Sequence, residues 1–88
     1  MDELTDEQVL KRASHAKQLL EDELFKEAIL VTEERIIDAW KVATNPEVRE
    51  ALHSQLNGLT TVLQKIRSIM VEGEFLKDHI EKKKRQEH

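Results

Sequence analysis

Apolar residues recur every three or four positions along most of the chain, which is the spacing of amphipathic α-helices. Three segments show this pattern, at about residues 6–21, 23–43 and 46–84. The short connections between them predict that the second and third segments form an antiparallel helical hairpin, preceded by the shorter first helix. The fold class expected from the sequence is therefore all-α.

Residues suited to helix ends mark the boundaries of these segments. Thr5 and Gln8 have the spacing of a capping box, in which each side chain bonds the backbone amide of the other residue. Asp22 is a suitable cap for the second helix, so we expect a bend there, although a continuous helix also fits the pattern. Asn45 and Pro46 suit the cap and the first position of the third helix, which predicts a tight reversal.

The third segment has one apolar stripe with nearly coiled-coil spacing. The stripe consists of Val48, Leu52, Leu56, Leu59, Leu63, Ile66, Met70, Leu76 and Ile80. Gly73 occupies the expected stripe position between Met70 and Leu76. On the second segment, apolar residues fill about half of the circumference, and Trp40 lies on this broad face near the turn. We predict that Trp40 is buried in the core; the alternative is that it contacts a partner protein.

Some apolar residues lie outside these stripes and need a further partner. Leu30 and Ile37 lie on the far side of the second segment, and Val71 and Phe75 lie four apart on the polar face of the third. The third segment also outruns the second, so its end must stay solvated, break near Gly73, pack on the first helix or meet another subunit. We predict a homo-oligomer in which these four apolar residues make the contacts, with a first helix folded over them as the intramolecular alternative.

The composition limits what the chain can build. Charged residues supply 36% of the chain and aromatic residues 3%, so the core must consist of aliphatic side chains. A chain of 88 residues supports one modest core, and we predict a single helical domain over residues 1–81 with a charged, mobile tail at 82–88. The chain has no cysteine and no long apolar run, which predicts a soluble, cytoplasmic protein without disulfides or a membrane span.

Charge is unevenly distributed along the chain. Residues 1–38 include eleven acidic and five basic residues, whereas residues 39–88 include seven acidic and nine basic ones. The basic run Lys82, Lys83, Lys84 and Arg85 is the candidate site for phosphate contact. The second predicted helix begins with acidic residues, unlike a recognition helix, so we expect no sequence-specific binding to nucleic acid.

Two short motifs contain residue types that occur in catalytic sites. Glu50 and His53 have the spacing of a di-iron ligand pair, but the chain has no second such pair, and both lie opposite the leucine stripe. Ser14 and His15 are adjacent, so their side chains point in different directions on a helix, and neither has an evident acidic partner. We therefore predict that the protein is not an enzyme and has no catalytic residues, metal site or cofactor.

Four segments together resemble a family of small helical proteins encoded in the genomes of tailed bacteriophages and prophages. These segments are Ala16–Ala28, Ile36–Trp40, Arg49–His53 and Val71–Glu74, and the resemblance covers about residues 12–80. Members of that family tend to be encoded among packaging and head genes. The resemblance therefore implies a role in DNA packaging or virion assembly, and it supplies no catalytic residues.

Within that setting, the chain is similar in kind to small terminase subunits, which are compact, helical, non-enzymatic proteins that form rings through a helical hairpin. It departs from them because it lacks an obvious basic DNA-binding module. The resemblance thus implies an assembly or adaptor protein that contacts a phage packaging or head protein. The alternative is a small regulatory or inhibitory protein that binds a host or phage enzyme through its acidic N-terminal half.

Overall fold

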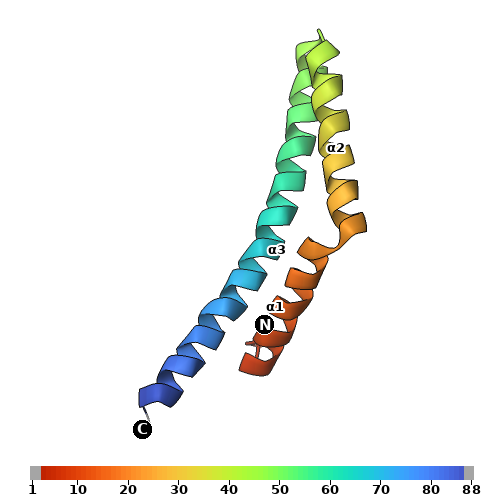
Figure 1. Cartoon of the computed structure of the whole chain (residues 1–88). Helices are drawn as coiled ribbons and strands as arrows, with labels where there is room; N and C mark the ends of the chain where they lie inside the picture. Colours follow the sequence, from red (N-terminus) through yellow and green to blue (C-terminus); the bar gives the residue numbers. More distant parts are fainter. Residues whose placement is uncertain (1–2, 87–88) are drawn as a thin grey trace. The chain divides into compact units, whose positions relative to one another are not determined.

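The computed structural model describes residues 3–86 and contains three α-helices in that range. Helix α1 spans Asp6–Glu21, α2 spans Glu23–Val42 and α3 spans Pro46–Gln86 (Figure 1). The prediction of an all-α chain with a long C-terminal helix is confirmed. Because the signals at the helix ends are local, the observed boundaries lie close to the expected ones.

Side-chain caps explain where the first two helices begin. The Thr5 amide donates to Gln8 Oε1 at 2.9 Å, and the Gln8 amide donates to Thr5 Oγ1 at 3.2 Å, which is the expected capping box. The Phe25 amide donates to Asp22 Oδ1 at 2.7 Å. The backbone of Asp22 is extended, with φ −65° and ψ 126°, so α1 and α2 are separate helices.

Helix α3 is continuous over its whole length. Asn45 caps it by accepting a hydrogen bond from the Glu47 amide at 2.8 Å, and Pro46 takes the first helical position. The helix does not break at Gly73, which was one of the alternatives for this segment. It also includes Lys82–Arg85, so no helix end separates this basic run from the residues before it.

The chain divides into two compact units. The crossing unit consists of residues 1–20 and 65–88, and in it α1 packs against the second half of α3. The hairpin unit consists of residues 21–64, and in it α2 runs antiparallel to the first half of α3 (Figure 1). The second half of α3, for which the sequence left several partners open, therefore packs on α1.

Small residues allow the two helices of the crossing unit to approach closely. Ala13 and Ala16 of α1 are 8% and 7% exposed, and Gly73 of α3 is buried beside Ala13. A Cβ atom on residue 73 would lie 3.5 Å from Ala13 Cα and 3.6 Å from the Val9 carbonyl oxygen, and would overlap Ala13 Cβ. Glycine is therefore required at position 73 for this approach.

The hairpin unit is more open than the crossing unit. Leu63, at 8% exposed, is its one buried residue, and α2 contributes none. The apolar residues between the two helices are half-buried: Phe25, Ile29, Ile36, Ala39, Leu52, Leu56 and Leu59. The leucine stripe predicted for α3 thus faces α2, but two helices alone leave much of each side chain uncovered.

Candidate functional site

The predicted contact residues form two pairs, one in each unit. Leu30 and Ile37 lie on α2 in the hairpin unit and are 55% and 39% exposed. Val71 and Phe75 lie on α3 in the crossing unit and are 40% and 73% exposed. All four residues keep much of their apolar surface accessible within the single chain, as expected for side chains that need a further partner.

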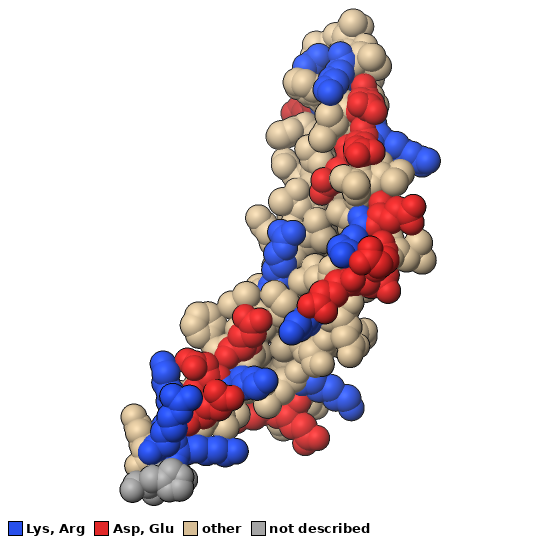
Figure 2. Space-filling model, viewed as in Figure 1, with Lys and Arg blue, Asp and Glu red and all other residues tan. Residues whose placement is uncertain are grey.

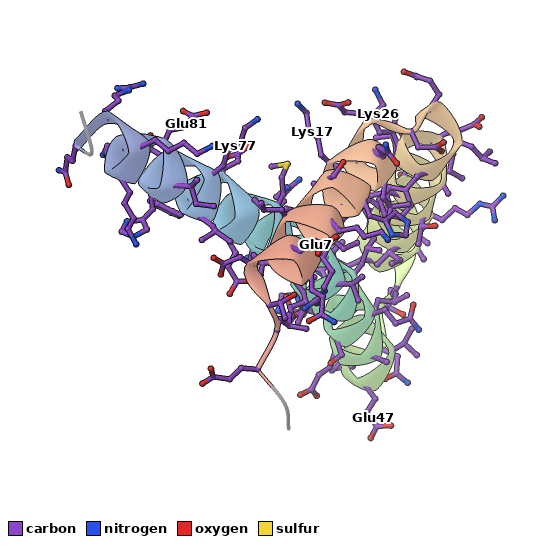
Figure 3. All side chains as sticks on the ribbon, turned by 90° about the horizontal axis from the view of Figure 1, so that it is seen from below. Glu7, Lys17, Lys26, Glu47, Lys77 and Glu81 are labelled. Carbon is purple, nitrogen blue, oxygen red and sulfur yellow. The ribbon has the colours of Figure 1, made fainter. Side chains whose placement is uncertain are left out.

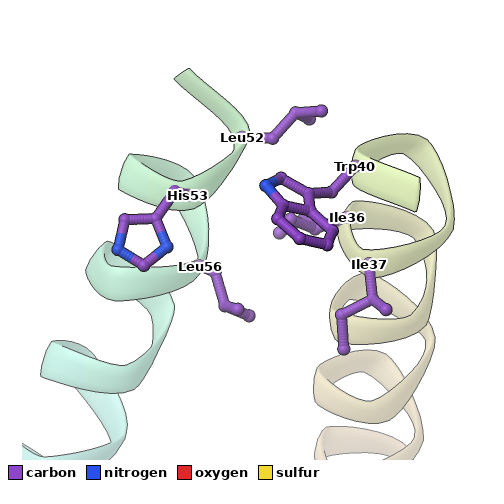
Figure 4. A pocket seen from close by; sticks show the side chains of 6 residues that line it. All are labelled: Ile36, Ile37, Trp40, Leu52, His53 and Leu56. Carbon is purple, nitrogen blue, oxygen red and sulfur yellow. The ribbon is translucent and has the colours of Figure 1, made fainter. Parts of the chain in front are cut away.

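Near the turn of the hairpin unit, side chains of α2 and α3 form an open apolar cavity of about 280 Å³. We term it the Trp40 cavity, and its lining consists of Ile36, Ile37, Trp40, Leu52, His53 and Leu56 (Figure 4). Figure 4 shows three residues of α2 across from three residues of α3. Four of the six lining side chains are aliphatic, the fifth is the indole of Trp40 and the sixth is His53. The cavity therefore suits an apolar ligand surface.

The prediction that Trp40 is buried in the core is wrong. The residue is 41% exposed and lies at the Trp40 cavity. The physical reason is that the hairpin unit has only two helices, so no third helix of that unit covers the outer side of the indole ring. Trp40 therefore belongs to the candidate contact surface, which was the alternative that the sequence left open.

Arg49 fixes the position of Trp40 across the turn. Its guanidinium carbon lies 3.9 Å from the centroid of the Trp40 ring, and its Nη1 donates to the Ala43 carbonyl at 3.0 Å. The first contact is a cation–π interaction, and the second places a positive charge at the C-terminal end of α2, where the helix dipole favours it. The indole ring is thus held in a defined orientation beside the cavity.

This role of Arg49 was not predicted from the sequence alone, in which Arg49 was considered within the Arg49–His53 segment of the resemblance. A signal was present, because Trp40 and Arg49 flank a tight turn and antiparallel helices bring such residues side by side. The same reasoning missed His53, which lines the Trp40 cavity. Its position there gives one polar group to an otherwise apolar surface.

Acidic residues dominate the outer surface of α2. Five acidic residues and three basic ones occur in this helix, and Lys26 Nζ forms an exposed ion pair with Glu23 Oε1 at 3.1 Å. Figure 2 shows acidic side chains along α2, with largely uncharged surface over the first half of α3 on the same face. The candidate contact surface of the hairpin unit is therefore an apolar area beside an acidic helix.

The basic run predicted to contact phosphate lies in the last turns of α3, in the crossing unit. Lys82 Nζ forms an exposed ion pair with Asp78 Oδ2 at 3.2 Å. Lys77 and Glu81 project away from the same part of the helix (Figure 3). Acidic residues are thus interspersed with the basic ones there, and phosphate contact by Lys82–Arg85 stays a prediction.

The two motifs considered for catalysis are not assembled into one site. Ser14 and His15 line different shallow cavities of the crossing unit, because neighbouring helical residues point in different directions. Within residues 3–86, no cluster of three or more His, Cys, Asp or Glu side chains is placed to hold a metal ion. No helix in this range combines the length and the apolar character needed to cross a membrane.

No protein-family model, curated protein or solved structure matches the chain. The geometry of the hairpin unit presents an apolar cavity with a positioned tryptophan and arginine, which are the residue types that most often dominate the binding energy of protein interfaces.

Proposed function

We propose that the protein is a non-enzymatic assembly or adaptor protein that acts by contacting other protein chains. The main observation is the amount of exposed apolar side chain. Eleven large hydrophobic residues of the described chain are at least 37% exposed, whereas only three apolar residues are buried. Extended apolar patches on a folded chain commonly mark surfaces that bind another protein.

The Trp40 cavity is the proposed contact site in the hairpin unit. A groove between two helices accepts the apolar face of a further amphipathic helix, with side chains inserted at one-turn intervals. Leu30 precedes Ile37 by seven residues, or about two helical turns, and so extends the apolar surface of the cavity along α2. A partner helix is therefore the ligand that best fits the shape and chemistry of this surface.

The proposed setting is DNA packaging or virion assembly in a tailed bacteriophage, with a role like that of a small terminase subunit. The resemblance of the four sequence segments to small phage proteins supports this setting. The partner would then be a phage packaging or head protein, and the contact would be made through protein surfaces rather than through recognition of a DNA sequence. The acidic surface of α2 agrees with a protein partner, because it would repel the phosphate backbone.

Affinity capture of the tagged chain from phage-infected or lysogenic cells tests the proposal. We expect a large terminase subunit, a portal or another head protein with the natural chain, and loss of that protein with Ile37→Glu. Leu4→Glu is the matched control, since it places the same charge on an exposed apolar residue of the crossing unit that is not a predicted contact residue. Phe75→Glu, at a predicted contact residue of the crossing unit, shows whether that unit takes part in the contact.

Three outcomes would contradict parts of this account. Retention of the partner by Ile37→Glu, combined with its loss from Phe75→Glu, would move the contact site to the crossing unit. Capture of a host polymerase, nuclease or defence protein would favour the regulatory alternative. Capture of no protein partner at all would contradict the adaptor function.

A further inference from the structure

Both helices of the hairpin unit have a second seam, on a different side from the Trp40 cavity. Its members are exposed and follow each other in alternating steps of three and four residues, which is the repeat of a coiled-coil contact. On α2 the seam consists of Leu24, Ala28, Val31, Arg35, Asp38 and Val42. On α3 it consists of Val48, Ala51, Gln55, Gly58 and Val62.

The part of the α2 seam from Val31 to Val42 is complementary to itself. If α2 packs antiparallel on α2 of a second copy, with the two-fold axis between residues 36 and 37, Val31 of each copy faces Val42 of the other. The same axis places Arg35 opposite Asp38, and symmetry creates this ion pair twice. Both charged residues are exposed, and neither forms an ion pair within residues 3–86.

The α3 part is also complementary to itself, about an axis at Gln55. Around that axis Val48 faces Val62, and Ala51 and Gly58 lie within one residue of facing each other. The space around Gly58 is open, with no atom within 4 Å of the position that a Cβ would take. Two small residues nearly opposite each other allow close approach of the helices, and the two Gln55 amides can hydrogen-bond to each other at the axis.

The two axes coincide in the structure. The Trp40 cavity is lined by residues within 36–40 of α2 and within 52–56 of α3. Because the two helices are antiparallel, residues 36 and 37 then lie about level with residues 55 and 56. The two-fold axis that pairs the charged residues and valines of α2 is therefore at the same level as the two-fold axis that pairs the valines and small residues of α3. We infer that a second copy of this chain packs on the seam, which forms a four-helix bundle from two hairpin units.

The apolar area of the seam agrees with this occupant. Its five large apolar residues are 37–78% exposed. The exposed apolar area of the seam is therefore on the order of 400 Å² per copy. Each partner of a standard interface contributes roughly 800 Å², and somewhat more than half of that area is apolar, so the seam supplies about the apolar area that such an interface needs. The inference rests on the proposed function only in that both require protein contacts, and it specifies a second copy as the occupant of a separate surface.

Sedimentation equilibrium of the purified chain tests the charge pairing. We expect a species of twice 10.3 kDa. Arg35→Asp and Asp38→Arg should each raise the dimer Kd at least tenfold, and the double reversal should restore it because opposite charges again face each other. Glu50→Arg, an exposed reversal outside the seam with the same change in charge as Asp38→Arg, should leave the Kd unchanged.

Cross-linking tests the position of the axis independently. The chain has no cysteine, so Gln55→Cys introduces one thiol next to the proposed axis, where it should form a disulfide between copies under mild oxidation. Asn57→Cys, an exposed position outside the seam, should not cross-link at the same rate.

A monomer at high micromolar concentration would overturn the inference. So would a dimer whose Kd is unchanged by Arg35→Asp and by Asp38→Arg and whose cross-linking rate is the same for Gln55→Cys and Asn57→Cys. Neither result would affect capture of a phage protein through the Trp40 cavity, so failure of the dimer and failure of the adaptor function can be told apart.

Discussion

The crossing unit and the hairpin unit are both pairs of helices joined by α3, yet they use their apolar residues differently. In the crossing unit, Gly73 lets α3 reach Ala13 and Ala16, and small side chains become buried because the helices are close. In the hairpin unit, larger side chains keep more of their surface accessible, and Leu63 alone is buried. Two helices that meet through small residues bury the side chains at their contact, because the helices lie close together. Two helices that meet through large residues leave part of each apolar side chain exposed, and this surface is available to a partner.

Placing a charge at the buried position of the hairpin unit has the largest expected effect. Leu63→Asp puts a carboxylate between α2 and α3 without a partner, and should lower the free energy of unfolding by about 3 kcal/mol or more. The neighbouring exposed change Gln64→Asp should alter it by about 0.5 kcal/mol or less. Urea denaturation followed by circular dichroism measures both, and equal midpoints for the two variants would show that Leu63 does not face α2.

Adding a methyl group to Gly73 tests the close approach in the crossing unit. Gly73→Ala should destabilise by about 1–3 kcal/mol, because the new Cβ overlaps Ala13. Gly58→Ala is the matched control in the same helix. Measured below the dimer Kd, where the chain is monomeric, it should stabilise by about 0.5–1 kcal/mol, since no atom of the same chain lies near that position.

A double variant shows whether the contact with Ala13 is the cause. Ala13→Gly costs about 1 kcal/mol of helix propensity on its own, but in the Gly73→Ala background it returns the space that the methyl group needs. The loss in the double variant should therefore be clearly smaller than the sum of the two single losses. Additive losses would argue against a direct contact between residues 13 and 73.

Removal of the Arg49 side chain should have a moderate effect confined to the turn of the hairpin unit. Arg49→Ala loses the contact with the Trp40 ring and the hydrogen bond to the Ala43 carbonyl, which together contribute about 1–2 kcal/mol. The fluorescence of Trp40 should shift to longer wavelength as the ring gains solvent. Arg49→Lys should be intermediate, because it retains the charge without the planar stacking group. An unchanged emission spectrum in Arg49→Ala would contradict the contact.

The smallest effect is expected for the exposed ion pair near the end of α3. Lys82→Gln removes the partner of Asp78 and should change the free energy of unfolding by less than about 0.5 kcal/mol, since both side chains are largely solvated. Thermal denaturation at low and at high salt measures this. A larger loss that disappears in salt would show that the pair contributes more to the crossing unit than its exposure suggests.

The sequence predicted the helix ends because their causes are local. The reciprocal bonds of Thr5 and Gln8 and the caps at Asp22 and Asn45 each involve residues within three positions of one another. The contact of Gly73 with Ala13 joins positions 60 residues apart, and no local pattern pairs them. Periodicity placed the predicted stripe of α3 correctly except for Val48, which is 48% exposed.

Periodicity could not predict how many helices would cover each face. For that reason Trp40 was expected in the core and is instead exposed. The four predicted contact residues were identified from surplus apolar surface, and they are exposed in the structure. The apolar cavity around Trp40 depends on side chains from two helices and on the position of Arg49, and so it became evident only in three dimensions.

Site-specific photo-cross-linking in phage-infected cells tests most directly whether the hairpin unit is the surface that binds other proteins. A photoreactive amino acid at Ile37, beside the Trp40 cavity, is compared with the same amino acid at the exposed Lys17 of the crossing unit. We expect a cross-link from position 37 to a phage packaging or head protein, and a much weaker one or none from position 17. Equal cross-linking from both positions, or none from position 37, would contradict it.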